Sequence, residues 1–491
     1  MIRPIPEGLA FDDVLLLPAF SDVPPSSVDT AVYLTPEIKL NIPFLSAGMD
    51  TVTEAKMAIA LARCGGLGVI HRHMSVQAQA SEVDKVKRSE HGVISDPFSL
   101  SPNHYVYEAD KLMEKYRISG VPITEHDKLV GIITNRDLRF ETDYSKKIYE
   151  VMTKAPLVTA PVGTTLDEAK EILTKHRVEK LPIVDEKGVL KGLITVKDIH
   201  KAIKYPHSAK DSQGRLLVGA AVGIKDDFLE RVHALAKRKV DVIALEVFHG
   251  HAKEVVAAIR AVKGDFPHIA IIAGNVATGD STQALIKAGA DIIKVGIGPS
   301  SVSTKRVVAG IGVPQVTAIM DCAAAAKDTG TPIIADGGIR YSGDITKALA
   351  AGATACMMGN LFAGCEESPG TTELFQGRKY KVYRGMEIAN TGFDDRVGEG
   401  SHFSPENGYT GSNGVKISKG VEGRITFKGD LAEVLQQLMG GLCVGMSYAG
   451  CSTIAELHRR AEFIKVTAAG LREGHPHDVQ VIRESPNYNI L

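Results

Sequence analysis

The sequence predicts an α/β protein whose main part is a (β/α)8 TIM barrel carrying a smaller inserted module. Short apolar runs rich in β-branched residues begin every 19 to 28 residues through the second half of the chain, with Ala/Lys/Leu-rich helical patterns between them. The chain has 491 residues, which is enough for one barrel of about 250 residues and a second unit. No Gly-x-Gly-x-x-Gly motif follows an early strand, so a barrel is favoured over an open doubly wound sheet.

Eight strands are expected in this barrel, two near the N-terminus and six in the second half of the chain. By residue range they are Phe44–Met49, Gly68–Ile70, Asp241–Phe248, Ile269–Val276, Asp291–Gly298, Val313–Ile319, Pro332–Ile339 and Ala355–Asn360. Most of these runs end in Gly, Asp or Asn, which are typical of loops where parallel strands finish. In such barrels functional sites are built at that end.

An internal duplication lies between about residues 94 and 205. Pro122 and Pro182 are 60 residues apart, whereas Gly131 and Gly192 are 61 apart, so two equivalent units differ by a single inserted residue. Each copy has a helical stretch, then β-rich runs, then a Thr-x-x-Asp step that opens another helix. The expected domains are therefore a barrel of residues 1–93 plus 206–491 and an insert of residues 94–205.

The two Thr-x-x-Asp steps, Thr134 to Asp137 and Thr195 to Asp198, have two interpretations. The duplicated context resembles a tandem pair of cystathionine-β-synthase-type (CBS) modules, a Bateman regulatory module. That resemblance implies that the steps face the ribose of a bound adenine or guanine nucleotide. Each step taken alone is explained equally well as a capping box at a helix start.

The composition excludes several classes of function. Lys and Arg number 57 against 58 Asp and Glu, so no overall field attracts nucleic acid or an anionic membrane. The lack of tryptophan and the 5% aromatic content argue against stacking of single-stranded nucleic acid. Six cysteines without a C-x-x-C pair indicate neither a disulfide framework nor a zinc site. No signal peptide and no long apolar run is evident, which predicts a soluble cytoplasmic protein.

Two consecutive strand ends late in the predicted barrel carry glycines that suit a phosphate. The first is Asp336-Gly337-Gly338 and the second is Gly359-Asn360. In such barrels the last two βα loops often present backbone N–H groups to a phosphate, and glycine permits its close approach. The Asp336 carboxylate is then expected to accept hydrogen bonds from a ribose diol. The alternative is that these glycines only form tight turns.

The run from Lys294 to Arg306 resembles the active-site loop of the inosine-5′-monophosphate (IMP) dehydrogenase / GMP reductase family, whose usual form is Gly-x-Gly-Pro-Gly-Ser-x-Cys-Thr-Thr. Besides the insert, further matches cover essentially the whole chain: Ala10–Pro18, Ser46–Glu54, Ala273–Val276, Gly312–Gln315, Glu366–Gly370, Tyr383–Met386, Gly420–Arg424 and Glu484–Tyr488.

The resemblance implies a mechanism and a set of site residues. In the family a cysteine thiolate attacks C2 of the purine, hydride passes to NAD, and water hydrolyses the covalent intermediate inside a mobile flap. The nucleotide would be held by Ser46, Met49, Ser301, Asp336, Gly338, Gly359, Asn360, Tyr383, Gly385 and Met386. The NAD side would include Glu246, Asn275, Gly296 and Gly298. Carbonyls near Gly296, Gly298 and Ser303, with Glu473 of the partner subunit, would bind a monovalent cation such as potassium in a homotetramer or octamer.

The departures from the family pattern gather at the predicted reaction centre. Ser303 stands at the position of the nucleophilic cysteine, and a hydroxyl, unlike a thiol of pKa ~8.5, needs a neighbouring base to react. The other changes are Ser300 for Gly, Lys305 for Thr, Val247 and Phe248 after Glu246 at the nicotinamide riboside contact, Glu387 for Gly beside the base, Lys419 for Glu or Gln, and Arg396-Val397 for the flap's Arg-Tyr pair. The catalytic candidates are Ser303, Lys305, Glu387, Lys419 and Arg396.

Three functions are compatible with the sequence. The first is an NAD-linked oxidoreductase of the IMP dehydrogenase type whose conventional oxidation is lost or reduced. The second is a paralogue that uses its new acids and amines, Glu246, Lys305, Glu387 and Lys419, for dehydration or epimerisation of a nucleotide or nucleoside, for example in a nucleoside natural-product pathway. The third is a non-catalytic regulator that binds nucleotides.

Overall fold

The computed structural model describes the chain except for residues 1–4, 90–96, 117, 225–226, 386–408, 411–415, 418–419, 483–487 and 489–491. The chain divides into two compact units. The first comprises Met1–Ser89, His207–Asp211 and Leu216–Leu491, and the second comprises Glu90–Pro206 with Ser212–Arg215. Both copies of the repeat lie in the second unit.

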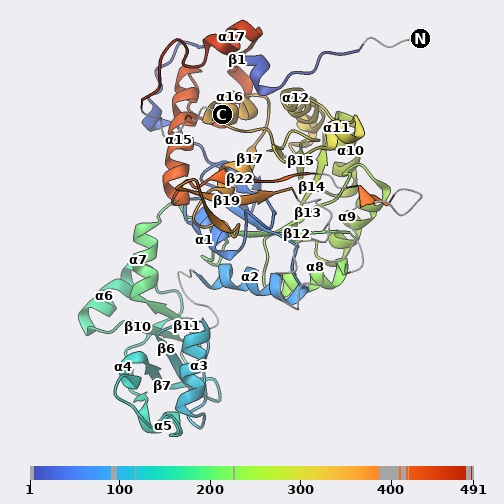
Figure 1. Ribbon diagram of the computed structural model, residues 1–491. Coiled ribbons are helices and arrows are strands. Elements are labelled where there is room, and N and C mark those ends of the chain that lie inside the picture. Colours follow the sequence, from blue (N-terminus) through green and yellow to red (C-terminus); the bar gives the residue numbers. More distant parts are fainter. Residues whose placement is uncertain are drawn as a thin grey trace. The chain divides into compact units, whose positions relative to one another are not determined.

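The core of the first unit is a closed barrel of parallel strands in the spatial order β12-β13-β14-β15-β16-β17-β4-β5 (Figure 1). Side chains fill such a barrel from inside and helices cover it outside, so its strands are apolar on both faces. This confirms the predicted barrel. The strands are β4 (Phe44–Ser46), β5 (Leu67–Ile70), β12 (Val218–Val222), β13 (Val242–Leu245), β14 (Ala270–Val276), β15 (Ile292–Val295), β16 (Ile333–Asp336) and β17 (Ala355–Met358).

One of the expected strands is wrong. The segment predicted as strand Val313–Ile319 instead contains the start of helix α12 (Gln315–Ala326), whose N-cap is Pro314. Four consecutive alanines end this helix, and alanine is the strongest helix former. The eighth strand is β12, which pairs with β5 and β13. Its sequence, Val-Gly-Ala-Ala-Val, has too few β-branched residues to signal a strand.

Helices surround the barrel, and small sheets extend from it (Figure 1). The helices are α1 (Ala55–Arg63), α2 (Val76–Ser89), α8 (Phe228–Lys237), α9 (Lys253–Asp265), α10 (Gly279–Ala288), α11 (Lys305–Ala309), α12, α13 (Ser342–Ala350), α14 (Asn360–Ala363), α15 (Leu431–Tyr448), α16 (Ile454–Arg460) and α17 (Ala468–Glu473), with short 3-10 turns at Phe11–Asp13, Pro25–Ser27 and Lys327–Thr329. Among the residues that the structure describes, none of the helices has the length and apolar character needed to cross a membrane.

The remaining strands of the first unit form four small sheets. A three-stranded sheet in the order β18-β19-β22 is the one that reaches the predicted site, because β19 ends at Arg384. The strands are β1 (Val14–Leu16) with β23 (Phe463–Lys465), β2 (Val32–Thr35) with β3 (Ile38–Leu40), β18 (Thr372–Phe375), β19 (Arg378–Arg384) and β22 (Glu422–Thr426), and β20 (Tyr409–Thr410) with β21 (Lys416–Ile417).

The second unit contains two similar halves, each with its own three-stranded sheet and apolar core. In both halves a helix precedes an antiparallel strand pair, and a threonine at the end of that pair caps the next helix. The first half has α3 (Val106–Tyr116), β6 (Gly120–Glu125), β7 (Lys128–Thr134), α4 (Asn135–Leu138), α5 (Ile148–Val151) and β8 (Thr153–Lys154). The second has β9 (Ala160–Pro161), α6 (Leu166–His176), β10 (Lys180–Val184), β11 (Leu190–Thr195) and α7 (Val196–Lys204).

Candidate functional site

A pocket opens at the carboxyl ends of the barrel strands. Its walls come mainly from the last residues of β14, β15 and β16 and from the segments that follow β4, β13, β15 and β16. This is the end of the barrel at which the sequence placed the site. The residues assigned from the sequence that line the pocket are Met49, Glu246, Asn275, Gly296, Gly298, Ser303, Lys305, Asp336 and Gly385.

A buried lysine holds the two acids of this pocket. Lys294, on β15, is 1% exposed, and its Nζ lies 2.7 Å from Oε1 of Glu246 and 3.2 Å from Oδ2 of Asp336. Burial alone would lower the pKa of Lys294, but the two carboxylates raise it above its ordinary value. No role was assigned to Lys294 from the sequence, although an ionisable residue inside an apolar strand is itself a signal of a site.

Two amide side chains fix the same region. Nδ2 of Asn275 donates to Oδ2 of Asp336 at 2.8 Å and to the carbonyl of Gly296 at 2.9 Å. Nε2 of Gln315, a residue that the sequence analysis did not single out, donates to the carbonyls of Val295 and Asp336 at 3.0 and 3.1 Å. The ends of β15 and β16 are therefore held together by side chains as well as by their backbone pairing.

Ser303 lines the pocket, and the contacts of its hydroxyl with the described residues are few. Its Oγ accepts a hydrogen bond from the backbone N–H of Lys305 at 3.4 Å, which is long. The Lys305 ammonium lies 5.5 Å from the centroid of the Phe248 ring. Among the hydrogen bonds of the described residues, none joins Ser303 Oγ to an imidazole or a carboxylate. Within the part of the chain that the structure describes, this hydroxyl is therefore given no base to ionise it.

No cysteine lines the pocket in place of the missing thiol. All six cysteines of the sequence belong to the described part of the chain, and none is exposed. Burial raises the pKa of every one of these thiols, for Cys322 to about 11 and for Cys365 to about 12. None of them is a ready thiolate at neutral pH.

Five residues predicted to hold the nucleotide contact one another, and Met49 among them also lines the pocket. Nδ2 of Asn360 donates to Oγ of Ser301 at 3.1 Å. Tyr383 is 2% exposed, and its hydroxyl donates to Sδ of Met49 at 3.8 Å. Burial raises the pKa of Tyr383 to about 12. A Cβ at Gly359 would lie 2.8 Å from the Tyr383 hydroxyl, so a larger residue there would require the tyrosine to shift.

The other predicted residues are placed as follows. Ser46 is buried and accepts a hydrogen bond from Oγ1 of Thr53 at 2.8 Å. Gly338 has a φ of 80° in the loop after β16. Glu473 ends α17 and is not among the lining residues of the pocket. Met386, Glu387, Arg396 and Lys419 lie outside the described residues.

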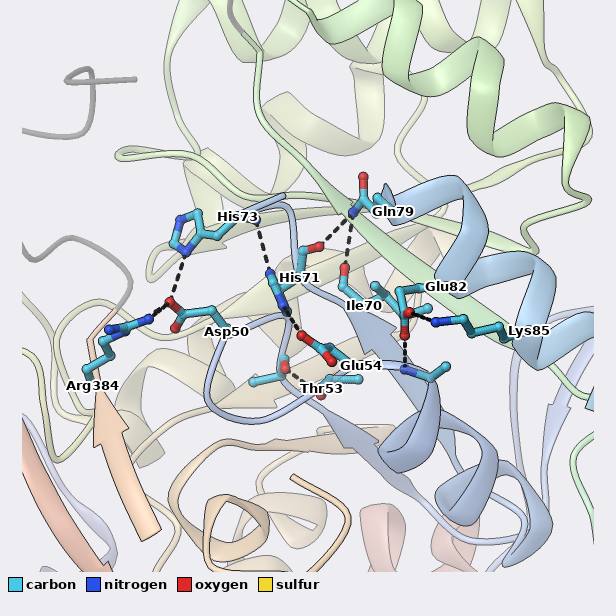
Figure 2. A network of polar contacts seen from close by, with 12 residues as sticks. Asp50, Thr53, Glu54, Ile70, His71, His73, Gln79, Glu82, Lys85 and Arg384 are labelled. Carbon is cyan, nitrogen blue, oxygen red and sulfur yellow. Dashed lines mark hydrogen bonds and ion pairs between the residues drawn. The ribbon is translucent and has the colours of Figure 1, made fainter. Parts of the chain in front are cut away.

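An ion-pair network connects two sides of the site (Figure 2). The Asp50 carboxylate accepts hydrogen bonds from Nε and Nη2 of Arg384 at 2.9 and 2.6 Å, and Nδ1 of His73 lies 3.6 Å away. Burial alone would raise the pKa of Asp50, but His73 and Arg384 together lower it well below its ordinary value. Because Asp50 follows Met49 and Arg384 lies between Tyr383 and Gly385, this network holds β19 against the loop after β4.

Replacing Asp50 with asparagine is expected to lower the free energy of unfolding by about 2 kcal/mol at pH 7. A lowered pKa in the folded state stabilises the protein above the ordinary pKa of Asp, about 4, and this contribution disappears as the pH falls towards the lowered value. The difference between the two proteins should therefore shrink below pH ~4. Urea unfolding at several pH values measures it. The exposed Asp328→Asn is the control, and a pH-independent loss would contradict the ion-pair explanation.

A closed (β/α)8 barrel with a charged pocket at the carboxyl ends of its strands is the arrangement of barrel enzymes. A family model described as the IMP dehydrogenase / GMP reductase domain matches residues 8–477. The chain therefore belongs to the IMP dehydrogenase / GMP reductase family, as its active-site loop indicated.

Known relatives and a solved structure agree with this assignment. The inosine-5′-monophosphate dehydrogenases of Halalkalibacterium halodurans and Bacillus subtilis are 59% and 58% identical to the chain, over 99% of this chain and 98% of each relative. A crystal structure of a GMP reductase variant from Trypanosoma brucei with guanosine 5′-monophosphate superposes with a TM-score of 0.86. It is 38% identical, over 97% of this chain and 99% of the other.

Proposed function

We propose that the protein binds a purine nucleoside 5′-monophosphate at the mouth of its barrel, and that its NAD-linked oxidation of that nucleotide is severely reduced. The observation that carries this proposal is the pocket composition: Ser303 lines it, and none of the six cysteines does. Protein groups that can contact a nucleotide line this region, whereas the thiolate that the family uses is absent from the pocket.

Binding of the nucleotide is supported by its two expected contact groups. The loops at Gly338 and Gly359 offer backbone N–H groups for the phosphate, and Ser301 with Asn360 offers a hydroxyl and an amide next to them. The Asp336 carboxylate is held by Lys294 and Asn275 and lines the pocket, where it can accept hydrogen bonds from a ribose diol.

The NAD side of the pocket fits its cofactor only in part. Asn275, Gly296 and Gly298 line the pocket as the resemblance implies. Glu246, however, is buried against Lys294, and the rim holds Phe248 where the family has a small residue. The usual pose of the nicotinamide riboside is therefore not supported.

A monovalent cation such as potassium would be held by carbonyls near Gly296, Gly298 and Ser303. Positive φ values of 152° and 77° turn the backbone at the two glycines, and Nε of Arg306 holds the carbonyl of Ile297 between them at 3.0 Å. Glu473 of the partner subunit would complete this site in a homotetramer or octamer.

The insert is proposed to be a CBS pair that binds adenine or guanine nucleotides. Its two halves repeat the same order of helix, strand pair and capped helix. Oγ1 of Thr134 donates to Asp137 at 2.7 Å, and Oγ1 of Thr195 donates to Asp198 at 2.5 Å. This capping geometry is shared by both interpretations of the Thr-x-x-Asp steps, so nucleotide titration of the full chain has to separate them.

The two other functions keep less support. The acid–base alternative used Glu246, whose carboxylate is paired with Lys294. It now depends on Lys305 and on two further residues, Glu387 and Lys419, and these two lie outside the described residues. A non-catalytic regulator predicts tight nucleotide binding by the wild-type chain and no turnover even after a thiol is restored.

Replacing Ser303 with cysteine tests the proposal. The variant should form NADH from IMP and NAD at least about tenfold faster than the wild-type chain, because a thiol ionises far more readily than a hydroxyl. NADH absorbance measures the rate, and Ser301→Cys, which places a thiol two residues away, should give no gain. Wild-type turnover that Ser303→Cys does not increase would contradict the proposed role. Failure of IMP to bind in equilibrium dialysis would contradict nucleotide binding itself.

A further inference from the structure

We infer that two residues near the C-terminus, His475 and Tyr488, position the loop that receives the nucleotide phosphate. This phosphate loop comprises residues 337–340, between the end of β16 and Tyr341. The inference rests on the proposed function, because it concerns the phosphate contacts of that same site. Tyr488 does not line the pocket, so it is a positioning residue that acts through Tyr341.

Three aromatic rings form a cluster at the start of α13. The rings of Tyr341 and Tyr488 are stacked, with centroids 6.0 Å apart and planes at 18° to each other. The His475 ring lies 6.4 Å from the Tyr341 centroid and 5.8 Å from the Tyr488 centroid, and its Nδ1 is hydrogen-bonded to the Tyr488 hydroxyl at 2.9 Å. Ring pairs at these distances attract one another. Two residues that follow α17 therefore hold the residue that precedes α13.

Tyr341 is the N-cap residue of α13, and one end of the phosphate loop is fixed there. The backbone N–H groups of Arg340 and Tyr341 donate to Oδ2 of Asp344 at 2.9 and 3.1 Å, and Asp344 is 3% exposed. These two N–H groups are already bonded to a carboxylate, so a phosphate has to use others. The ring cluster holds the side chain of Tyr341, while Asp344 holds its backbone.

The other end of the loop is fixed from inside the barrel. Asp336, the residue before the loop, accepts hydrogen bonds from Lys294 and Asn275. Beyond it, the backbone N–H groups of Gly338 and Ile339 donate to no acceptor within the described part of the chain. Unpaired N–H groups in a loop that is held at both ends are what the oxygens of a phosphate require.

A loop that already has its binding geometry loses less conformational freedom when the ligand binds. Removing the Tyr488 ring takes away the stacking partner of Tyr341 and so loosens the α13 end of the loop. An aromatic pair contributes enough to change an equilibrium constant by roughly twofold to tenfold. Because the ion pair of Arg340 with Asp12 remains as a second support, we expect a change of about fivefold.

The first measurement compares a ligand that has a phosphate with one that lacks it. Tyr488→Ala should raise the dissociation constant of IMP about fivefold and that of inosine by less than about twofold, because only IMP contacts the phosphate loop. Tyr488→Phe keeps the stacked ring, so its IMP constant should stay within about twofold of the wild-type value. Tyr448→Ala removes a tyrosine that is 69% exposed at the end of α15, and this control should bind IMP like the wild type. Equilibrium dialysis with the full-length chain gives all these constants.

The second measurement follows the loop without any ligand. Hydrogen exchange of the amides in residues 337–341 should be about fivefold faster in Tyr488→Ala than in the wild-type chain, because the loosened loop opens more often. The amides of β14 in the barrel core should exchange at the same rate in both proteins.

Three outcomes would overturn the inference: unchanged exchange of the loop in Tyr488→Ala, an equal weakening of IMP and inosine in that variant, or a loss of IMP affinity in Tyr488→Phe as large as in Tyr488→Ala. A wild-type chain that bound no IMP would contradict the proposed function. The exchange of the ligand-free loop would still decide whether Tyr488 positions it.

Discussion

Replacing Lys294 with methionine is expected to lower the free energy of unfolding by about 3–5 kcal/mol, because it leaves two carboxylates without their buried partner. Lys294 is 1% exposed and contacts both Glu246 and Asp336. Methionine is similar in length and apolar, so the loss would come from the missing charge more than from a cavity. Denaturant unfolding at pH 7 measures the change, and the pocket should also bind IMP less tightly because Asp336 loses a hydrogen-bond donor.

Two comparisons assign this loss to the charge cluster. Lys287→Met, at an exposed position on α10, should change stability by no more than about 0.5 kcal/mol. Adding Glu246→Gln to Lys294→Met should recover part of the lost stability, because one uncompensated carboxylate is removed. A loss below about 1 kcal/mol for Lys294→Met would show that water already reaches and screens this cluster.

Replacing Gly296 with alanine is expected to prevent the pocket from forming and to cost about 4 kcal/mol or more of stability. The residue has a φ of 152°, and a Cβ there would lie 2.0 Å from the carbonyl oxygen of Asp336 and 3.2 Å from Nε2 of Gln315. The obstructing atom is backbone on the adjacent barrel strand, so β15 and β16 would have to separate. Circular dichroism, unfolding and IMP binding together measure the effect.

Gly343→Ala provides the matched control for this substitution. Gly343 lies in α13, and a Cβ there would meet no heavy atom within 4 Å. Alanine is a better helix former than glycine, so this change should stabilise the protein by up to about 1 kcal/mol. If Gly296→Ala behaved like Gly343→Ala, the close approach of Gly296 to Asp336 would not be a requirement of the folded chain.

The barrel could be predicted from the sequence because most of its strands carry a local signal. Buried parallel strands are continuous apolar runs, and five of the six runs expected in the second half of the chain contain a strand of the barrel. The missed strand and the helix that was predicted as a strand have one cause. Val218–Val222 is a strand because β5 and β13 pair with it, and Gln315–Ala326 is a helix despite the Val and Ile at its start. Neither tertiary pairing nor helix continuation can be judged from a five-residue window.

The residues of the site also fall into two classes, those that the sequence predicts and those that only the structure reveals. Ser303, Lys305, the glycines at 296 and 298, and Asp336 could be predicted because they belong to one motif or follow a strand. Gln315 and the pair of Asp50 with Arg384 could not, since these contacts join residues far apart in the chain. The sequence placed Glu246 on the NAD side and in the acid–base alternative, and only the structure shows that its carboxylate is paired with Lys294.

The sequence by itself determined the family, the barrel, the duplicated insert and the replacement of the expected cysteine by Ser303, because each of these is written in local order and spacing. Only the tertiary structure decided which charges neutralise one another and that, among the described residues, no imidazole or carboxylate is hydrogen-bonded to Ser303. Those properties depend on distances across the barrel mouth: Lys294 contacts Glu246 after β13 and Asp336 at the end of β16, and Phe248 contacts Lys305 from a different loop. Electrostatic interactions depend on separation in space and on burial, and neither follows from separation along the chain.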